Sequence, residues 1–167
     1  IDLSACTSVG EYAFDKCSNI TSVTWPTDKM KEIPAQCFSG CISLKNFNND
    51  TGFNLTGINS IAAYAFSDST GISGSIDLSD CTFIGNGAFQ TCSSIASVTW
   101  PVDTMPTIPY ACFANCTSLK YFNSNTELDL KGITSIGGAS FKLVGAAPVS
   151  PPAQKRLKKK RFKTSRM

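Results

Sequence analysis

The residues of this chain that most readily carry chemistry are its eight cysteines. Cys37 and Cys41 lie four residues apart, as do Cys112 and Cys116, and no C-x-x-C pair occurs. The chain has no histidine, so a zinc site would need four thiolates gathered at one point. A nucleophilic serine or cysteine would likewise have no histidine to act as its base. The cysteines alone therefore predict neither a metal centre nor a catalytic thiol.

Carboxylates and glycine-rich loops offer no better candidate for catalysis. The glutamates Glu11, Glu32 and Glu127 are far apart in sequence, and the aspartates lie mainly in turn-like stretches such as SDST and NNDT. Glycoside chemistry needs two acids that face each other across a cleft. The stretch GNGAF begins like a phosphate-binding loop but lacks the third glycine and the Lys-Ser/Thr pair. We therefore predict that the chain is not an enzyme and uses no cofactor.

Charge divides the chain into two unequal parts. Residues 1–154 contain seven basic and twelve acidic residues, a net charge of −5, whereas residues 155–167 contain eight basic residues and no acidic one. The basic run follows GAAPVSPP, whose prolines disfavour packed structure. We expect residues 147–167 to form a Pro-containing linker and a disordered basic tail. A nuclear signal, a nucleic-acid contact and the flank of a membrane span remain alternatives for the tail.

The cysteines also belong to an internal repeat with a period of 75 residues. When residues 1–66 are aligned with those 75 positions later, about 36 of the 66 are identical, and every cysteine meets a cysteine. Within each unit, a dipeptide ending in phenylalanine recurs at steps of 24, 28, 23, 24 and 28 residues. The phenylalanines are Phe14, Phe38, Phe66, Phe89, Phe113 and Phe141. Each 75-residue unit therefore holds three copies of a shorter motif.

Each copy of the motif combines a short strand with a turn. Stretches such as SVTW, KNFN and SIDL are rich in β-formers, whereas Ala13, Phe14 and Cys17 have the spacing of a helical or 3-10 turn. A single copy cannot bury its own apolar side, but copies stacked with strands about 4.8 Å apart can. We predict an α/β repeat solenoid, mainly β, over residues 1–146, with superrepeats 1–75 and 76–146. Insertions near TGFNLTG and TELDLKG should bulge from one edge of the coil.

The motif resembles a known repeat family. The pattern I-x-x-x-A-F-x-x-C-x-x-L-x-x-V-x-L/W-P, which covers residues 1 to about 146, resembles the BspA-like class of leucine-rich repeats of microbial cell surfaces. The third and sixth copies depart from it, because they lack the cysteine. The resemblance implies a right-handed coil with parallel strands on a concave face and turns on the convex face. It also implies a non-catalytic binding or adhesion segment of a larger cell-surface protein, with a protein or glycan ligand.

The alignment of the repeat copies predicts that the phenylalanines and cysteines are core residues. Two core columns are predicted. The first consists of Phe14, Phe38, Phe66, Phe89 and Phe113, and the second consists of the cysteines that follow three residues later in the sequence, Cys17, Cys41, Cys92 and Cys116. Buried free thiols acting as small hydrophobes are the first interpretation of the cysteines. Disulfides Cys17–Cys41 and Cys92–Cys116 are the second, because neighbouring rungs lie within reach of a bridge, and metal binding is the third. Trp25 and Trp100 are expected to fill space at the ends of two strands.

Polar residues that flank the buried strand positions should face the concave surface. They are Ser22, Thr24, Asn46, Asn48, Ser75, Asp77, Ser97, Thr99, Tyr121 and Asn123. This ribbon is nearly uncharged and has one aromatic anchor, Tyr121, which suits broad contact with a protein or glycan better than a small-molecule pocket. We predict that this ribbon is the binding surface of an extracellular or cell-surface protein.

A competing hypothesis is an intracellular scaffold, cytoplasmic or nuclear, whose basic tail contacts nucleic acid or an import receptor. A leader peptide upstream of Ile1 would favour the surface protein, and its absence together with reduced cysteines would favour the scaffold. No stretch of the sequence reaches the roughly 18 consecutive apolar residues of a transmembrane helix. Four N-glycosylation sequons, relevant to a eukaryotic secretory route, begin at Asn19, Asn49, Asn54 and Asn115.

Overall fold

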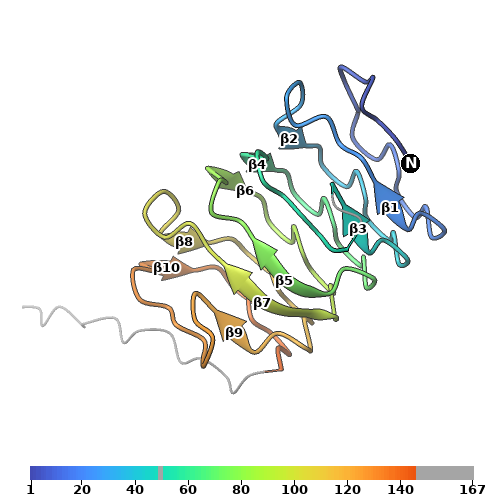
Figure 1. The fold of residues 1–167 in the computed structure, drawn as a ribbon. Coiled ribbons are helices and arrows are strands. Elements are labelled where there is room, and N and C mark those ends of the chain that lie inside the picture. The colour runs from blue at the N-terminus through green and yellow to red at the C-terminus, as the bar shows by residue number, and fades with distance from the viewer. Residues whose placement is uncertain (49–50, 146–167) are drawn as a thin grey trace, which may run out of the picture.

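Each turn of the coil carries two short strands in the computed structural model, which describes residues 1–48 and 51–145 (Figure 1). The first series of strands comprises β1 (Ser22–Val23), β3 (Asn46–Phe47), β5 (Gly74–Asp77), β7 (Ile95–Thr99) and β9 (Tyr121–Phe122). The second series comprises β2 (Glu32–Ile33), β4 (Ser60–Ile61), β6 (Phe83–Ile84), β8 (Thr107–Ile108) and β10 (Ser135–Ile136). About five stacked turns result, and each turn covers the apolar side of the next.

Strands pair only within their own series, and all of these pairings are parallel. The first series forms the sheets β1–β3 and β5–β7–β9, and the second forms β2–β4–β6 and β8–β10. Equivalent residues of successive copies lie opposite each other, so that Val98 of β7 faces Phe122 of β9. The predicted parallel-strand solenoid is thereby confirmed. The second series was not predicted, although each of its strands ends in a repeated isoleucine.

The turn segment around each phenylalanine is not helical, which corrects the α/β class and the helical or 3-10 turns that we expected. Throughout the described residues these segments are hydrogen-bonded turns without helix. In the first copy the backbone N–H groups of Tyr12, Phe14 and Lys16 donate to Ala35, Cys37 and Ser39 of the next copy. The N–H groups of Asp15 and Cys17 instead donate three residues back, to Tyr12 and Phe14. Because alternate N–H groups bond to the neighbouring turn, the regular i→i−4 pattern of an α-helix cannot form.

Left-handed backbone conformations accompany this bonding pattern. The residues two positions before and two positions after each phenylalanine have positive φ angles, as at Gln36 (52°) and Gly40 (68°), and at Tyr64 (56°) and Asp68 (58°). Most of these residues are not glycine, so each carries a conformational cost that the inter-turn hydrogen bonds offset. The turn segments of successive copies thus form a third wall of the coil beside the two strand series.

The interior contains a continuous stack of the repeated phenylalanines. Neighbouring rings from Phe14 to Phe141 lie 5.3, 5.6, 5.6, 5.8 and 6.1 Å apart between centroids, and their planes differ by at most 16°. Phe38, Phe66, Phe89 and Phe113 are fully buried, whereas the terminal Phe14 is half-buried. A second column from the first strand series meets the stack edge-on, as Phe47 does with Phe38 and Phe66. These parallel and perpendicular contacts are the arrangements that aromatic rings prefer.

The two insertions do not simply bulge from an edge of the coil. In the first insertion Phe53 forms a parallel bridge with Phe47 and is only 7% exposed. Its ring lies 5.3 Å from that of Phe47 and 5.2 Å from that of Phe66. In the second insertion Leu128 bridges Phe122 in the same way. Each insertion therefore supplies a partial rung: the first lies between the β1–β3 sheet and the β5–β7–β9 sheet, and the second follows β9.

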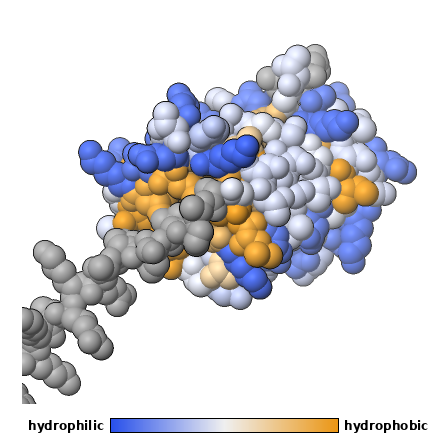
Figure 2. All heavy atoms as spheres, turned by 90° about the horizontal axis from the view of Figure 1, so that it is seen from below, coloured by the Kyte–Doolittle hydropathy of each residue, from blue (hydrophilic) through white to orange (hydrophobic). Residues whose placement is uncertain are grey.

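On the face that Figure 2 shows, most of the surface is polar or intermediate in hydropathy, and apolar side chains gather mainly toward one end of the coil. In the last described turn Ile136, Phe141 and Val144 are only partly buried, because no described turn covers them. Leu143 in this turn is 67% exposed. The predicted linker and tail, residues 147–167, lie outside the described residues.

Candidate binding surface

The predicted binding residues lie on the first strand series but do not form one continuous ribbon. Ser22 pairs with Asn46 in the β1–β3 sheet, and Ser75, Ser97 and Tyr121 lie side by side across β5, β7 and β9. Asp77 lies opposite Thr99, while Thr24 forms a bridge with Asp2. Since the Phe53 insertion intervenes between the two sheets, the ten residues divide into two groups.

A shallow hollow of about 360 Å³ lies over the β5–β7–β9 group. It is lined by Ser75, Ser97, Val98, Thr99, Asn123, Ser124 and Asn125. The lining is hydroxyl- and amide-rich and carries no charged side chain. The Ser97 hydroxyl donates to the Ser75 hydroxyl at 2.6 Å, so these two groups are already ordered. Ser124 and Asn125 were not predicted, because they belong to the segment leading into the second insertion rather than to the strand pattern.

Two of the predicted binding residues, Asn48 and Asn123, also hold the backbone together. The side-chain oxygen of Asn48 accepts the backbone N–H of Trp25 at 2.6 Å, and that of Asn123 accepts the backbone N–H of Trp100 at 2.6 Å. Both asparagines have a φ of 51°, a conformation that asparagine tolerates better than most residues. Each oxygen therefore already accepts one hydrogen bond within the fold, and Asn123 also lines the hollow.

The tryptophans that follow the first-series strands fill the interior. Trp25 and Trp100 are each 3% exposed. Their indole N–H groups donate to the carbonyls of Met30 and Met105, at 2.9 and 2.7 Å. Since the polar atom of each ring is satisfied internally, neither tryptophan offers a surface for a ligand.

The eight cysteines are free thiols, six of them buried. Cys41, Cys92 and Cys116 donate through sulfur to the phenylalanine carbonyl of the preceding copy, at 3.1, 3.0 and 3.1 Å. Ser69, which replaces cysteine in the third copy, donates to the Phe38 carbonyl at 2.6 Å. The position three residues after the repeated phenylalanine is therefore occupied by a small side chain that donates a hydrogen bond, and both cysteine and serine can do so. Cys17 and Cys6 are half-buried.

Burial holds the interior thiols in the protonated state. Desolvation raises the pKa of Cys37, Cys81 and Cys116 to about 12 and that of Cys41 to about 11. Desolvation also raises the pKa of Cys92 and Cys112 well above the ordinary range. Thiols of this kind are poor nucleophiles and poor metal ligands near neutral pH, because both roles need the thiolate. Over residues 1–48 and 51–145 no group of three metal-ligating side chains lies close enough to hold an ion.

The sequons lie in different settings. Asn19 is exposed. Asn54 is half-buried, and its side-chain oxygen accepts the N–H of Thr56 at 2.9 Å. Asn115 is half-buried with a φ of 61° in the turn wall. Asn49 lies outside the described residues. Asn19 therefore has the most accessible side chain of the three that the structure describes.

Parallel strands stacked in short turns around an aromatic and aliphatic core define a solenoid of the leucine-rich-repeat kind, a class that typically serves as a binding scaffold. The model of the BspA type leucine rich repeat region, with six copies, matches residues 49–165. The chain belongs to this BspA-type leucine-rich-repeat family.

Solved structures of similar fold come from bacteria. A leucine rich repeat protein of T. pallidum is 22% identical, with a TM-score of 0.56, over 77% of this chain and 65% of its own. A leucine rich cell surface protein of Faecalibacterium prausnitzii A2-165 is 22% identical, with a TM-score of 0.62, over 83% of this chain and 42% of its own. The chain thus spans less than two thirds of either protein. A comparison with curated protein sequences found no significant match. In the part that the structure describes, no helix is long and apolar enough to cross a bilayer.

Proposed function

We propose that this chain is a non-catalytic binding or adhesion segment of a larger cell-surface protein and that it acts outside the cell. The family membership and the description of the F. prausnitzii relative as a cell surface protein support this proposal. Residues 1–146 act as the binding unit, and residues 147–167 act as a linker and tail. The ligand is a protein or a glycan.

The observation that carries the proposal is the hollow over β5, β7 and β9. Its hydroxyl and amide groups can donate and accept hydrogen bonds without a buried charge to desolvate. Tyr121 pairs with Ser97 and lies next to the hollow without lining it, where it offers the aromatic anchor that binding surfaces commonly contain. A shallow and uncharged surface of this kind suits modest-affinity contact with an extended partner.

The internal repeat supplies a matched control for the test. Thr99 and Tyr121 belong to the hollow side, and the residues 75 positions earlier, Thr24 and Asn46, occupy equivalent strand positions in the β1–β3 sheet. The double variant Thr99→Lys/Tyr121→Ala places a long charged side chain at the hollow and removes its anchor. The double variant Thr24→Lys/Asn46→Ala makes the corresponding change outside the hollow.

Binding of the labelled full chain to cultured epithelial cells is measured by flow cytometry, with cells also treated with protease or with periodate to destroy protein or glycan. We expect the hollow variant to bind at least about tenfold more weakly, with the control variant unchanged. Equal binding by both variants would contradict the placement of the site, and no binding by the parent chain would contradict adhesion to these cells. Loss of binding after only one cell treatment identifies the ligand class.

A further inference from the structure

The turn wall contains a second polar hollow, of about 340 Å³, where the first superrepeat meets the first copy of the second, and the proposed function does not use it. It is lined by Gln36, Ser39, Tyr64, Ser67, Asp68 and Gln90. These residues come from three successive copies, at the positions two before, one after and two after the repeated phenylalanine. Stacking therefore brings side chains that are distant in sequence to one place on the outside of the coil.

The backbone that carries these side chains is fixed by hydrogen bonds between turns. The N–H of Tyr64 donates to the Asn86 carbonyl at 2.9 Å, and that of Asp68 donates to the Gln90 carbonyl at 2.8 Å. The N–H of Gln36 donates to the Ala63 carbonyl at 3.1 Å. A hollow built on such a framework is largely formed before a ligand arrives, which lowers the entropic cost of binding.

Gly87 determines where the Tyr64 ring lies. Gly87 is the residue that follows Tyr64 in the column, and it has a φ of 61°. A Cβ atom at this position would collide with the Cδ1–Cε1 edge of the Tyr64 ring. The absence of a side chain therefore lets the ring lie over the next turn, where it forms an apolar wall of the hollow.

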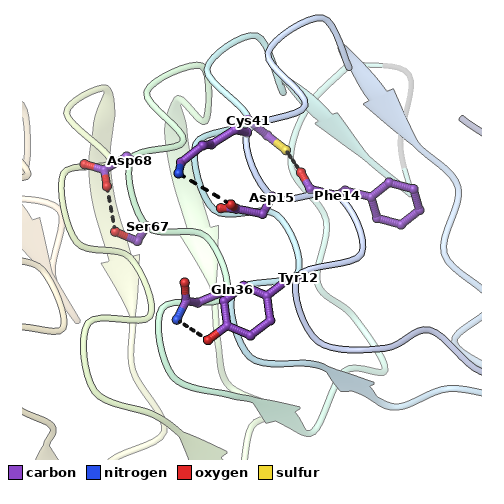
Figure 3. Close-up of polar contacts among 8 residues, drawn as sticks. Tyr12, Phe14, Asp15, Gln36, Cys41, Ser67 and Asp68 are labelled. Atoms are coloured by element: carbon purple, nitrogen blue, oxygen red, sulfur yellow. Dashed lines mark hydrogen bonds and ion pairs between the residues drawn. The ribbon is translucent and has the colours of Figure 1, made fainter.

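Two hydrogen bonds order polar side chains that line this hollow, and Figure 3 shows both of them, although it does not draw Tyr64. The Gln36 amide donates to the Tyr12 hydroxyl at 3.0 Å, and the Gln36 side-chain oxygen can accept a further hydrogen bond. The Ser67 hydroxyl donates to the Asp68 carboxylate at 3.1 Å. Gln90 has no such hydrogen bond to a described residue, so its amide is available to a ligand as both donor and acceptor.

The second superrepeat has the same fold without this site. The residues equivalent to Gln36, Ser39 and Tyr64 are Ala111, Ala114 and Ala139. The positive φ angles are kept, at 52° for Ala111 and 59° for Ala139. Because alanine satisfies the same backbone positions, the polar and aromatic side chains of the first superrepeat are not required for folding.

We propose that this hollow binds a neutral saccharide, independently of the strand-series hollow. Pyranose hydroxyls both donate and accept, and the lining offers amides, hydroxyls and one carboxylate that match both roles. The C–H face of a sugar ring can pack on the flat apolar surface of Tyr64. An ammonium or guanidinium ligand has no acceptor for the amide and hydroxyl donors, and an anionic ligand would be repelled by Asp68.

The test uses the isotope-labelled full chain and follows its backbone amide resonances by NMR during titration. The probes are the neutral disaccharides lactose, maltose, cellobiose and N,N′-diacetylchitobiose, together with 3′-sialyllactose and trilysine. We expect at least one neutral disaccharide, at millimolar concentration, to shift the amides of residues 36, 64, 68 and 90 saturably. Tyr64→Ala, which reproduces the residue found 75 positions later, should weaken this binding at least about tenfold.

Tyr110→Ala is the matched control, because Tyr110 is a 54% exposed tyrosine of the turn wall that does not line the hollow. This variant should bind like the parent chain, and both variants should keep the parent spectrum elsewhere. The proposal is overturned if no neutral disaccharide shifts these amides, if trilysine or sialyllactose shifts them more strongly, or if Tyr64→Ala binds as well as the parent. Shifts confined to residues 75, 97, 99 and 123 would overturn it while supporting the strand-series site.

Discussion

The side-chain oxygen of Asn48 lies 2.6 Å from the backbone nitrogen of Trp25, one turn earlier in the coil. The same relationship recurs 75 residues later between Asn123 and Trp100, also at 2.6 Å. An asparagine that ends one strand therefore satisfies the backbone of the preceding turn. This contact converts two residues that look like ligand-facing polar groups into part of the fold.

Replacing Asn48 or Asn123 with alanine should destabilise the protein by about 1–3 kcal/mol, because the backbone N–H of Trp25 or Trp100 loses its acceptor in a partly buried setting. Asn→Gly at the same positions introduces a residue that adopts the positive φ readily but has no side chain to accept the hydrogen bond. Most of the loss in the free energy of unfolding should therefore remain. Urea unfolding followed by circular dichroism measures both. Asn46→Ala on β3 is the control and should stay within about 0.5 kcal/mol of the parent. A loss restored fully by glycine would instead assign the effect to backbone strain.

Phe89→Ala should lower the free energy of unfolding by about 3–5 kcal/mol. The Phe89 ring is fully buried between Phe66 and Phe113, at 5.6 and 5.8 Å, so its removal leaves a cavity that both neighbours border. Phe14→Ala should cost less, since Phe14 is half-buried and stacks on Phe38 alone within the phenylalanine column. Equal losses for the two variants in urea unfolding would contradict the proposed stack.

All eight cysteines should react with an alkylating reagent when the protein is denatured without reductant, because all are free thiols. In the native protein Cys6 and Cys17 should react first, since they are half-buried whereas the other six are buried. Intact mass spectrometry over time gives the count, and peptide mapping gives the order. Fewer than eight labels after denaturation would favour the disulfides Cys17–Cys41 and Cys92–Cys116.

Stability should fall as the pH rises above about 9, the ordinary range for an unperturbed thiol. Burial raises the pKa of Cys37 to about 12, so above pH 9 the unfolded chain releases a proton that the folded chain keeps. Deprotonation then favours the unfolded state progressively until the pH reaches the folded pKa. Near and below neutral pH these thiols are protonated in both the folded and the unfolded state, so they should not make the free energy of unfolding depend on pH.

The repeat again supplies the control variant for this pH dependence. Cys37 and Cys112 stand where other copies have Ala65 and Ala88, both fully buried. The double variant Cys37→Ala/Cys112→Ala should therefore fold and should lose less stability than the parent between pH 8 and about pH 10. Identical urea midpoints for parent and variant across this range would show that the two thiols do not contribute.

The repeat made the solenoid predictable, because the recurrence of Phe14, Phe38 and their successors gives both the period and the stacking direction. The turn conformation was not predictable in the same way. The spacing of Ala13, Phe14 and Cys17 is compatible with a helical turn and with the observed turn wall. What distinguishes the two is the bonding of alternate N–H groups to the next copy, which depends on a neighbour that local spacing does not describe.

The candidate site was less predictable than the fold for a related reason. Ser97, Thr99 and Tyr121 follow from strand alternation, but Ser124 and Asn125 reach the hollow only because the second insertion adds a partial rung. The structural role of the Asn48 and Asn123 oxygens depends on a left-handed backbone and a hydrogen bond to the preceding turn. The hollow on the turn wall depends on Gly87 leaving space for Tyr64, which no sequence pattern expresses.

The hydrogen bonds that join Tyr12, Phe14 and Lys16 to the next copy have counterparts between all later pairs of neighbouring copies that the structure describes, and they run along the stacking direction. A tension applied between the two ends of the coil would therefore load successive interfaces in series rather than all at once. Under such a load the coil should lengthen by releasing one turn after another, so that it would extend in steps rather than rupture in a single event.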